Sequence, residues 1–165
     1  MKSSVIKYDK DNIDTDVILP GQYLKLHDYA EIAKHAMEGI DKNFHSKVKN
    51  AEFIVAGKNF GCGSSREHAT IALSQSGIKA VLAVSFARIF YRNSVDGGFL
   101  IPYESTEKLI DKIKTGDLLE IDLENNSLKN ITENQVYSLK PLGNVLPIIQ
   151  EGGIFEYARK NGMII

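Results

Sequence analysis

One stretch of the sequence combines residue types that can act on a small anion. Residues 61–69 read GCGSSREHA and follow the apolar run 53–56. Ser64 and Glu67 have the S-x-x-E spacing of a capping box, which predicts that a helix begins at Ser64. Free N–H groups at that helix end, glycines that let a ligand approach the backbone, and the forked guanidinium of Arg66 together suit a carboxylate.

The same pattern also fits a strand, a turn and a capped helix without any ligand, an arrangement that many α/β proteins contain. It does not match the phosphate-binding loop, because no Gly-Lys-Ser/Thr closes it, and it is not the dinucleotide fingerprint. Nor is it the G-x-S-x-G turn of hydrolases. Spacing alone therefore leaves a ligand site and a plain turn open.

The flanking elements predict an α/β fold in a single domain over residues 1–165. Gly77 is expected to end the helix that carries residues 69–75, and the buried strand 79–84 follows at a spacing that suits a parallel crossover. Further strands are predicted at 5–8 and 99–102, a hairpin at 118–123 and 127–131, and helices at 29–38, within 40–50, and at 86–95, 104–114, 145–150 and 154–160. Parallel strands thus come first and an antiparallel hairpin later.

Three segments of the chain resemble motifs of the aconitase superfamily. Residues 61–69 are similar to its G-x-G-S-S-R-E-H-A signature. Residues 12–24 resemble its N-terminal D-T-D and Y-L segment, and residues 85–93 resemble its S-F-A-R-I-F-Y-R-N segment. Within the superfamily the chain looks like the free-standing small subunits of the isopropylmalate dehydratase family. The resemblance implies the swivelling β/β/α fold, with a mixed sheet flanked by helices.

The resemblance also implies a reaction and its residues. The family removes water from a 2-hydroxy dicarboxylate and adds it back at the neighbouring carbon. Ser64 matches the catalytic serine that takes the carbon-bound proton, and Asp16 matches an active-site aspartate. Ser65 and Arg66 match residues that hold substrate carboxylates. Helix capping alone is the alternative role for Ser64.

Substrate choice in the family is linked to the segment that begins at the Y-L pair. Here the segment is Tyr23, Leu24, Lys25 and Leu26, which we expect to bind substrate. It has no arginine to read a third carboxylate, and its two leucines suit an isopropyl group, whereas the ammonium of Lys25 could serve an extra carboxylate. Isopropylmalate, in leucine biosynthesis, is therefore favoured over homoaconitate and over small methylated malates such as citramalate or dimethylmalate.

Composition limits the partners. The 20 Lys and Arg against 21 Asp and Glu give a net charge of −1, which indicates neither nucleic acid nor an anionic membrane as a partner. No signal peptide or apolar membrane segment is expected, and a single cysteine fits the cytoplasm. One thiol cannot hold a four-iron cluster. The [4Fe–4S] cluster implied by the resemblance is therefore expected on a separate large subunit, and no metal on this chain.

Other residues have competing interpretations. Cys62 is either a small packing residue or, with His68 as base, a reactive thiol. The aspartates between residues 9 and 16 lack the glycine and glutamate of a calcium loop, and are expected to cap backbone N–H groups. Arg88 and Asn93 either shape the cleft or subunit contact or brace helices. A non-catalytic anion-binding module remains the rival from another functional class.

Overall fold

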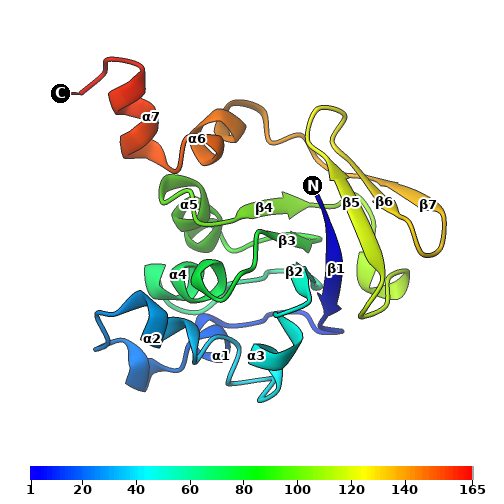
Figure 1. Ribbon diagram of the computed structural model, residues 1–165, viewed down its shortest axis with the longest axis horizontal. Helices are drawn as coiled ribbons and strands as arrows, with labels where there is room; N and C mark the ends of the chain where they lie inside the picture. Colours follow the sequence, from blue (N-terminus) through cyan, green and yellow to red (C-terminus); the bar gives the residue numbers. More distant parts are fainter. Residues whose placement is uncertain (165) are drawn as a thin grey trace.

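The computed structural model describes residues 1–164, and a seven-stranded mixed sheet organises them. The strands are β1 Lys2–Lys7, β2 Ala51–Val55, β3 Ala80–Ala83, β4 Ile101–Glu104, β5 Leu118–Asp122, β6 Ser127–Asn130 and β7 Gln135–Ser138. Their order across the sheet is β4-β3-β2-β1-β5-β6-β7. Strands β1 to β4 are parallel to one another, β5 is antiparallel to β1, and β5 to β7 are antiparallel to one another (Figure 1). The predicted α/β class and strand directions are confirmed.

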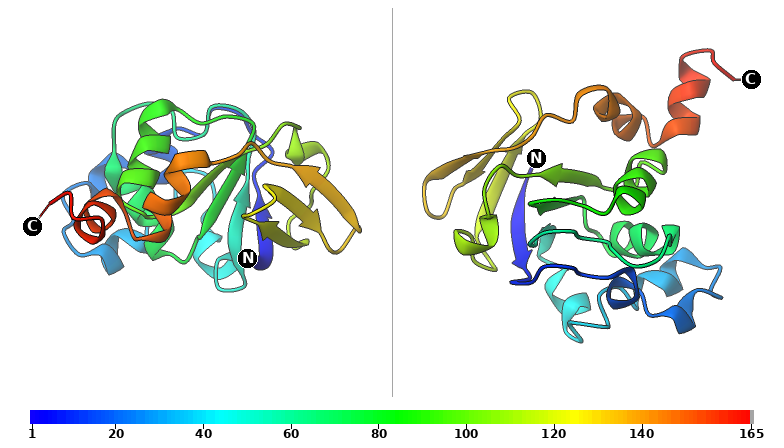
Figure 2. Two further views of the ribbon diagram at one scale, coloured as in Figure 1. Left: turned by 90° about the horizontal axis from the view of Figure 1, so that it is seen from above. Right: turned by 180° about the vertical axis from the view of Figure 1, so that it is seen from behind.

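Most helices gather on the side of the parallel strands away from β5–β7, whereas the short turn η2 lies beside β5, as both views in Figure 2 show. They are α1 Thr15–Ile18, η1 Gly21–Tyr23, α2 Tyr29–Ala33, α3 Phe44–Lys47, α4 Glu67–Gln75, α5 Arg88–Asp96, η2 Leu109–Asp111, η3 Gly143–Val145, α6 Leu146–Gln150 and α7 Ile154–Lys160. No helix in the described part of the chain is long and apolar enough to cross a membrane.

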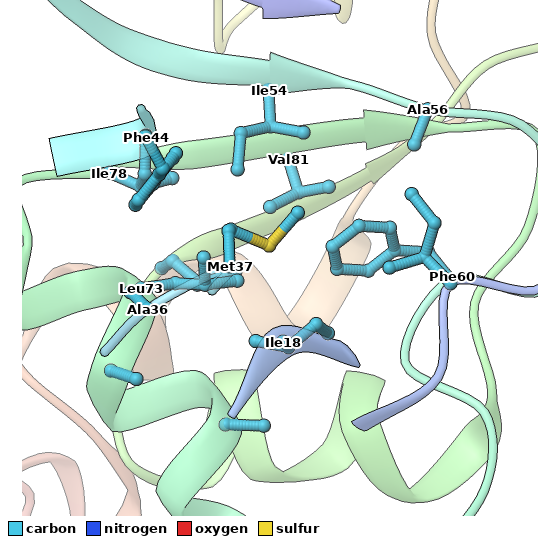
Figure 3. Close-up of a cluster of buried hydrophobic side chains, with 14 of the residues drawn as sticks. Ile18, Ala36, Met37, Phe44, Ile54, Ala56, Phe60, Leu73, Ile78 and Val81 are labelled. Atoms are coloured by element: carbon cyan, nitrogen blue, oxygen red, sulfur yellow. The ribbon is translucent and has the colours of Figure 1, made fainter. Parts of the chain in front are cut away.

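Alternating side chains of the parallel strands enter two hydrophobic clusters. Ile6, Ile54 and Val81 belong to one cluster, which helices α1 to α4 complete. Figure 3 shows how Met37 and Leu73 meet the strands there. Val5 and Leu82 point the other way, into the cluster shared with β5–β7. Because both faces are buried, the strands read as continuous apolar runs in the sequence.

One predicted helix is shorter than its apolar spacing indicated. The helix expected at 29–38 ends at Ala33. Its start is capped by Asp28, which accepts a hydrogen bond from the Ala30 N–H at 2.8 Å. Turns then carry Ala36 and Met37 into the core, and Met37 adopts a φ of 59° that no helix contains. Buried turns can therefore mimic the spacing of a helix.

The prediction of a helix at 104–114 is wrong. Strand β4 runs to Glu104, and Ser105 forms a bridge with Leu139, so the segment begins as an extension of the sheet. Only the short turn η2 follows, and it buries Leu109 and Ile110. Strand β7 was not predicted, because Tyr137 is its only buried residue and the alternation is too short to register. The remaining predicted strands and helices are present, with ends shifted by up to three residues.

Candidate active site

The three motif segments meet where three adjacent parallel strands end. Residues 8–16 follow β1, residues 56–66 follow β2 and residues 84–87 follow β3. Main-chain hydrogen bonds join them: the Gly61 N–H donates to the Ile13 carbonyl at 2.8 Å, and the Thr15 N–H donates to the Cys62 carbonyl at 2.8 Å. On the other side, the Phe60 N–H donates to the Ser85 carbonyl at 3.0 Å. The carboxyl edge of a parallel sheet is a common place for ligand sites.

Two glycines let these segments approach closely. Gly61 has a φ of 77°, and a Cβ there would lie 2.1 Å from Cγ of Phe90. Gly63 has a φ of 91°, and a Cβ there would lie 2.2 Å from a carboxylate oxygen of Asp14. A side chain at either position would both strain the backbone and collide with a neighbour. The two glycines therefore allow this loop to pack closely against Phe90 and Asp14.

Ser64 does not begin the helix that follows, which corrects the capping-box prediction. Helix α4 starts at Glu67, with Arg66 as N-cap, and the Arg66 N–H instead bonds to the Ser64 carbonyl at 2.9 Å. The Ser64 side chain is exposed and its Oγ lies 3.4 Å from Oγ1 of the buried Thr15. The Ser64 N–H also donates to Thr15 Oγ1, at 3.2 Å. Thr15, which the sequence analysis did not assign, thus holds Ser64 in place.

Arg66 and Asp16 form an ion pair beside this serine. The Arg66 Nη1 donates to the Asp16 carboxylate, and 21% of the arginine side chain is exposed against 58% of the aspartate. Asp14 caps α1 by accepting a hydrogen bond from the Asp16 N–H at 2.7 Å. An arginine has five N–H donors, so the guanidinium retains donors for a second anion. Ser65, which directly precedes Arg66, is exposed.

Comparison with known proteins gives the family. The aconitase C-terminal domain family matches residues 2–108. This chain belongs to that family. Its described structure is similar to the crystal structure of 3-isopropylmalate dehydratase (LeuD) from Methanocaldococcus jannaschii, with a TM-score of 0.90 and 46% identity over 98% of this chain and 95% of that one. The predicted swivelling-domain fold of the aconitase superfamily is therefore confirmed.

Curated relatives of this aconitase-family chain carry two different names. The 3-isopropylmalate dehydratase small subunit of Caldicellulosiruptor saccharolyticus is 48% identical over 150 residues, which cover 90% of this chain and 86% of that protein. The methanogen homoaconitase small subunit of Methanocaldococcus jannaschii is also 48% identical, over 155 residues that cover 93% of this chain and 89% of that protein. Overall identity therefore does not separate the two substrates.

In this aconitase-family chain, the turn that leads into residues 23–26 lies beside the ion pair. A Cβ on Gly21, two residues earlier, would lie 3.5 Å from the Asp16 carboxylate and 3.7 Å from the Arg66 guanidinium. Leu24 and Leu26 are half-buried against the core, and Lys25 is exposed. The structure thus brings Asp16, Ser64 and Arg66 together with Gly21, which begins the η1 turn that ends at Tyr23.

Cys62 favours the packing interpretation. Burial, followed by the negative charge of Asp14, raises the pKa of its thiol, so the thiolate is disfavoured at neutral pH. In residues 1–164 no hydrogen bond joins Cys62 to His68, and no three His, Cys, Asp or Glu side chains are grouped as metal ligands. A lone thiol does not fit an iron–sulfur cluster, so the residues of this chain do not fit that cofactor.

The third motif divides between the core and the surface. Phe86 and Phe90 stack in parallel with centroids 6.2 Å apart, and both meet Phe60 edge-on. Arg88 is exposed and lines a hollow of about 320 Å³ with Phe86 and Tyr91. Asn93 is half-buried, and its carbonyl closes the last turn of α5. In this structure the motif braces the loop that carries Ser64.

Proposed function

We propose that this chain is the small subunit of a 3-isopropylmalate dehydratase, and that it interconverts 2- and 3-isopropylmalate with a separate large subunit. The observation that carries the proposal is the exposed Ser64 beside the Asp16–Arg66 ion pair, on a loop fixed by two other motif segments. Family membership and the names of the relatives support the reaction class.

Ser64 is assigned the carbon-bound proton. In the dehydration step, the C–H electron pair forms the double bond, the proton goes to the serine oxygen and hydroxide leaves the neighbouring carbon. An alkoxide needs stabilisation at neutral pH, and the nearby cation of Arg66, together with the N–H groups that begin α4, supplies positive potential. Rehydration at the other carbon reverses these movements and completes the isomerisation.

Arg66 and Ser65 are assigned to substrate carboxylates. The guanidinium offers two parallel N–H donors to a carboxylate, and its pairing with Asp16 fixes the direction of the fork. The partner subunit is assigned the [4Fe–4S] cluster, because this chain has a single cysteine, and that cluster would supply a Lewis acid for the departing hydroxide. We also infer a cytoplasmic location, where a lone thiol stays reduced.

Isopropylmalate is the proposed substrate because residues 23–26 provide two leucines and no arginine. Homoaconitate is the second candidate, since a relative named as a homoaconitase small subunit is 48% identical and Lys25 places an ammonium in the same segment. Small methylated malates such as citramalate are the third. Relative kcat/KM values for these acids distinguish the three.

The test reconstitutes the chain with a cluster-loaded large subunit and follows hydration of isopropylmaleate and citraconate. We expect activity only in the complex, and a loss of about a thousandfold in kcat for Ser64→Ala, because a proton-transfer group is removed. Retention of most activity in folded Ser64→Ala complex would overturn the serine assignment. A chain that binds dicarboxylates but activates no large subunit would instead favour the non-catalytic anion-binding module.

A further inference from the structure

Tyr23 is held by two side chains from outside its own segment. Its ring stacks on the imidazole of His35, with centroids 3.6 Å apart and planes 9° from parallel. Its hydroxyl donates to Oε1 of Glu38 at 3.2 Å, and the other oxygen of Glu38 lies 2.8 Å from Nδ1 of His35. The three side chains therefore form a closed triangle, which we call the Tyr23 clamp.

The clamp supplies directional contacts that the backbone of this segment lacks. In the described part of the chain, residues 20–26 make backbone hydrogen bonds only with one another, such as that from the Tyr23 N–H to the Pro20 carbonyl at 3.0 Å. No strand of residues 1–164 forms sheet hydrogen bonds with this segment. Apart from the apolar packing of Tyr23, Leu24 and Leu26 on the core, the clamp is what orients the segment.

The charges at the clamp are consistent with a persistent contact. The hydrogen bond from His35, ahead of smaller contributions, lowers the pKa of Glu38, so the carboxylate remains ionised at neutral pH. Tyr23 and His35 each expose only part of their surface, and Tyr23 also packs on the core. Stacked aromatic rings add a preferred orientation to simple burial.

We propose that His35 and Glu38 are positioning residues that hold Tyr23, and through it residues 24–26, in the orientation that receives the substrate side group. This inference rests on the proposed function, because it assumes that residues 23–26 contact the substrate. It assigns a role to two residues outside all three motifs. The expected signature is a change in KM with kcat preserved, since the proton-transfer group Ser64 is held by other contacts.

The kinetic test compares Glu38→Ala with Glu38→Gln in the reconstituted complex. We expect Glu38→Ala to raise KM for isopropylmalate about tenfold, the effect of losing two side-chain hydrogen bonds, with kcat within about twofold. Glu38→Gln keeps an acceptor for the Tyr23 hydroxyl and should recover part of the loss. Glu31→Ala is the matched control, because Glu31 pairs with the exposed Lys34 in the same region and does not take part in the clamp.

A second measurement separates the clamp from the proposed function. Amide hydrogen exchange of residues 22–26 in the isolated chain should accelerate at least about fivefold in Glu38→Ala, because local opening becomes easier, and stay unchanged in Glu31→Ala. Unchanged exchange in Glu38→Ala overturns the clamp, whatever the activity. Faster exchange with an unchanged KM for every substrate tested overturns the proposed role of residues 23–26 in binding and leaves the clamp only a structural contact.

Discussion

Two parts of the candidate site are held in different ways. Residues 57–66, which carry Ser64 and Arg66, are joined by main-chain hydrogen bonds to the segments after β1 and β3. Within residues 1–164, the segment 20–26 has no such bonds to other segments and depends on side chains, in particular on the Tyr23 clamp. The loop assigned to the chemistry is therefore held by main-chain hydrogen bonds. The segment assigned to substrate choice is held by contacts of particular side chains.

This difference has a consequence for how such a domain changes substrate. Main-chain bonds survive most substitutions, because they do not depend on the side chain, whereas a clamp of three side chains changes whenever one of them does. Two relatives that are each 48% identical to this chain are named for different substrates. We expect that difference to lie in segments held like residues 20–26, with the loop 57–66 retained. Four substitutions test the comparison.

The largest effect should come from Gly61→Ala, which disturbs the loop 57–66 that main-chain hydrogen bonds hold. The added Cβ would lie 2.1 Å from Phe90, at a φ of 77° that disfavours any side chain. Strain and overpacking together should lower the free energy of unfolding by about 3 kcal/mol. Urea denaturation measures this loss, and the complex should be inactive.

Gly116→Ala provides the control for Gly61→Ala. Gly116 has a φ of 94°, but nothing lies within 4 Å of a Cβ built there. It should therefore show backbone strain alone, about 1 kcal/mol, with activity retained. Equal losses in the two variants would mean that the close contact between Gly61 and Phe90 contributes nothing.

Arg66→Lys should have the next largest effect, on substrate affinity. Lysine keeps the charge but loses the planar fork that can hold Asp16 and a substrate carboxylate at once. We expect kcat/KM to fall about a hundredfold, mostly through KM, because a bidentate contact is lost. Arg159→Lys is the control, since Arg159 pairs with Glu156 on the exposed helix α7. Steady-state rates that match the wild type would remove Arg66 from the site.

Thr15→Val should slow the reaction without a large change in substrate affinity. Valine keeps the shape of Thr15 but removes the hydroxyl that contacts Ser64 through its N–H, carbonyl and Oγ. We expect kcat to fall about tenfold to thirtyfold and the free energy of unfolding to fall by about 1–2 kcal/mol. Single-turnover rates and urea denaturation measure the two effects.

Thr70→Val is the matched control for Thr15→Val. Thr70 is fully buried, and its hydroxyl donates to the Glu67 carbonyl within α4. The same change there should cost similar stability with kcat preserved. A loss of kcat that merely follows the loss of stability in both variants would argue against a specific role for Thr15.

Local patterns in the sequence predicted much of this architecture. Strand, loop and helix spacing placed residues 57–66 after a buried strand, and α2 begins at Tyr29 as its spacing predicted. The capping box at Ser64 failed because Thr15, 49 residues away, competes for the serine by a contact that no local pattern contains. The prediction of a helix at 104–114 failed for the same reason, since Ser105 pairs with the distant Leu139.

In the candidate site, the positions of some residues can be compared with the sequence, whereas the roles assigned to them stay predictions. Asp16, Ser64 and Arg66 lie in recognisable motifs, and the structure brings them together. His35 lies outside all three motifs, yet it stacks on Tyr23. Its role depends on turns that follow α2, whose course the helical periodicity did not indicate. Residues that act by supporting others are thus the part that sequence patterns miss.

The smallest effect should come from Lys25→Met, and it addresses the substrate directly. Lys25 is exposed between the half-buried Leu24 and Leu26, so its removal should leave the segment in place. If the side group received here is isopropyl, an ammonium contributes little, and kcat/KM for isopropylmalate should change by less than about threefold. For a substrate with a third carboxylate, loss of a charged partner should cost about tenfold or more. Parallel assays on isopropylmalate and homoaconitate measure both values in one variant.

A large loss on isopropylmalate would show that the segment receives a charged group. Lys34→Met is the control, because it removes an exposed ammonium that is paired with Glu31, and it should leave both rates unchanged.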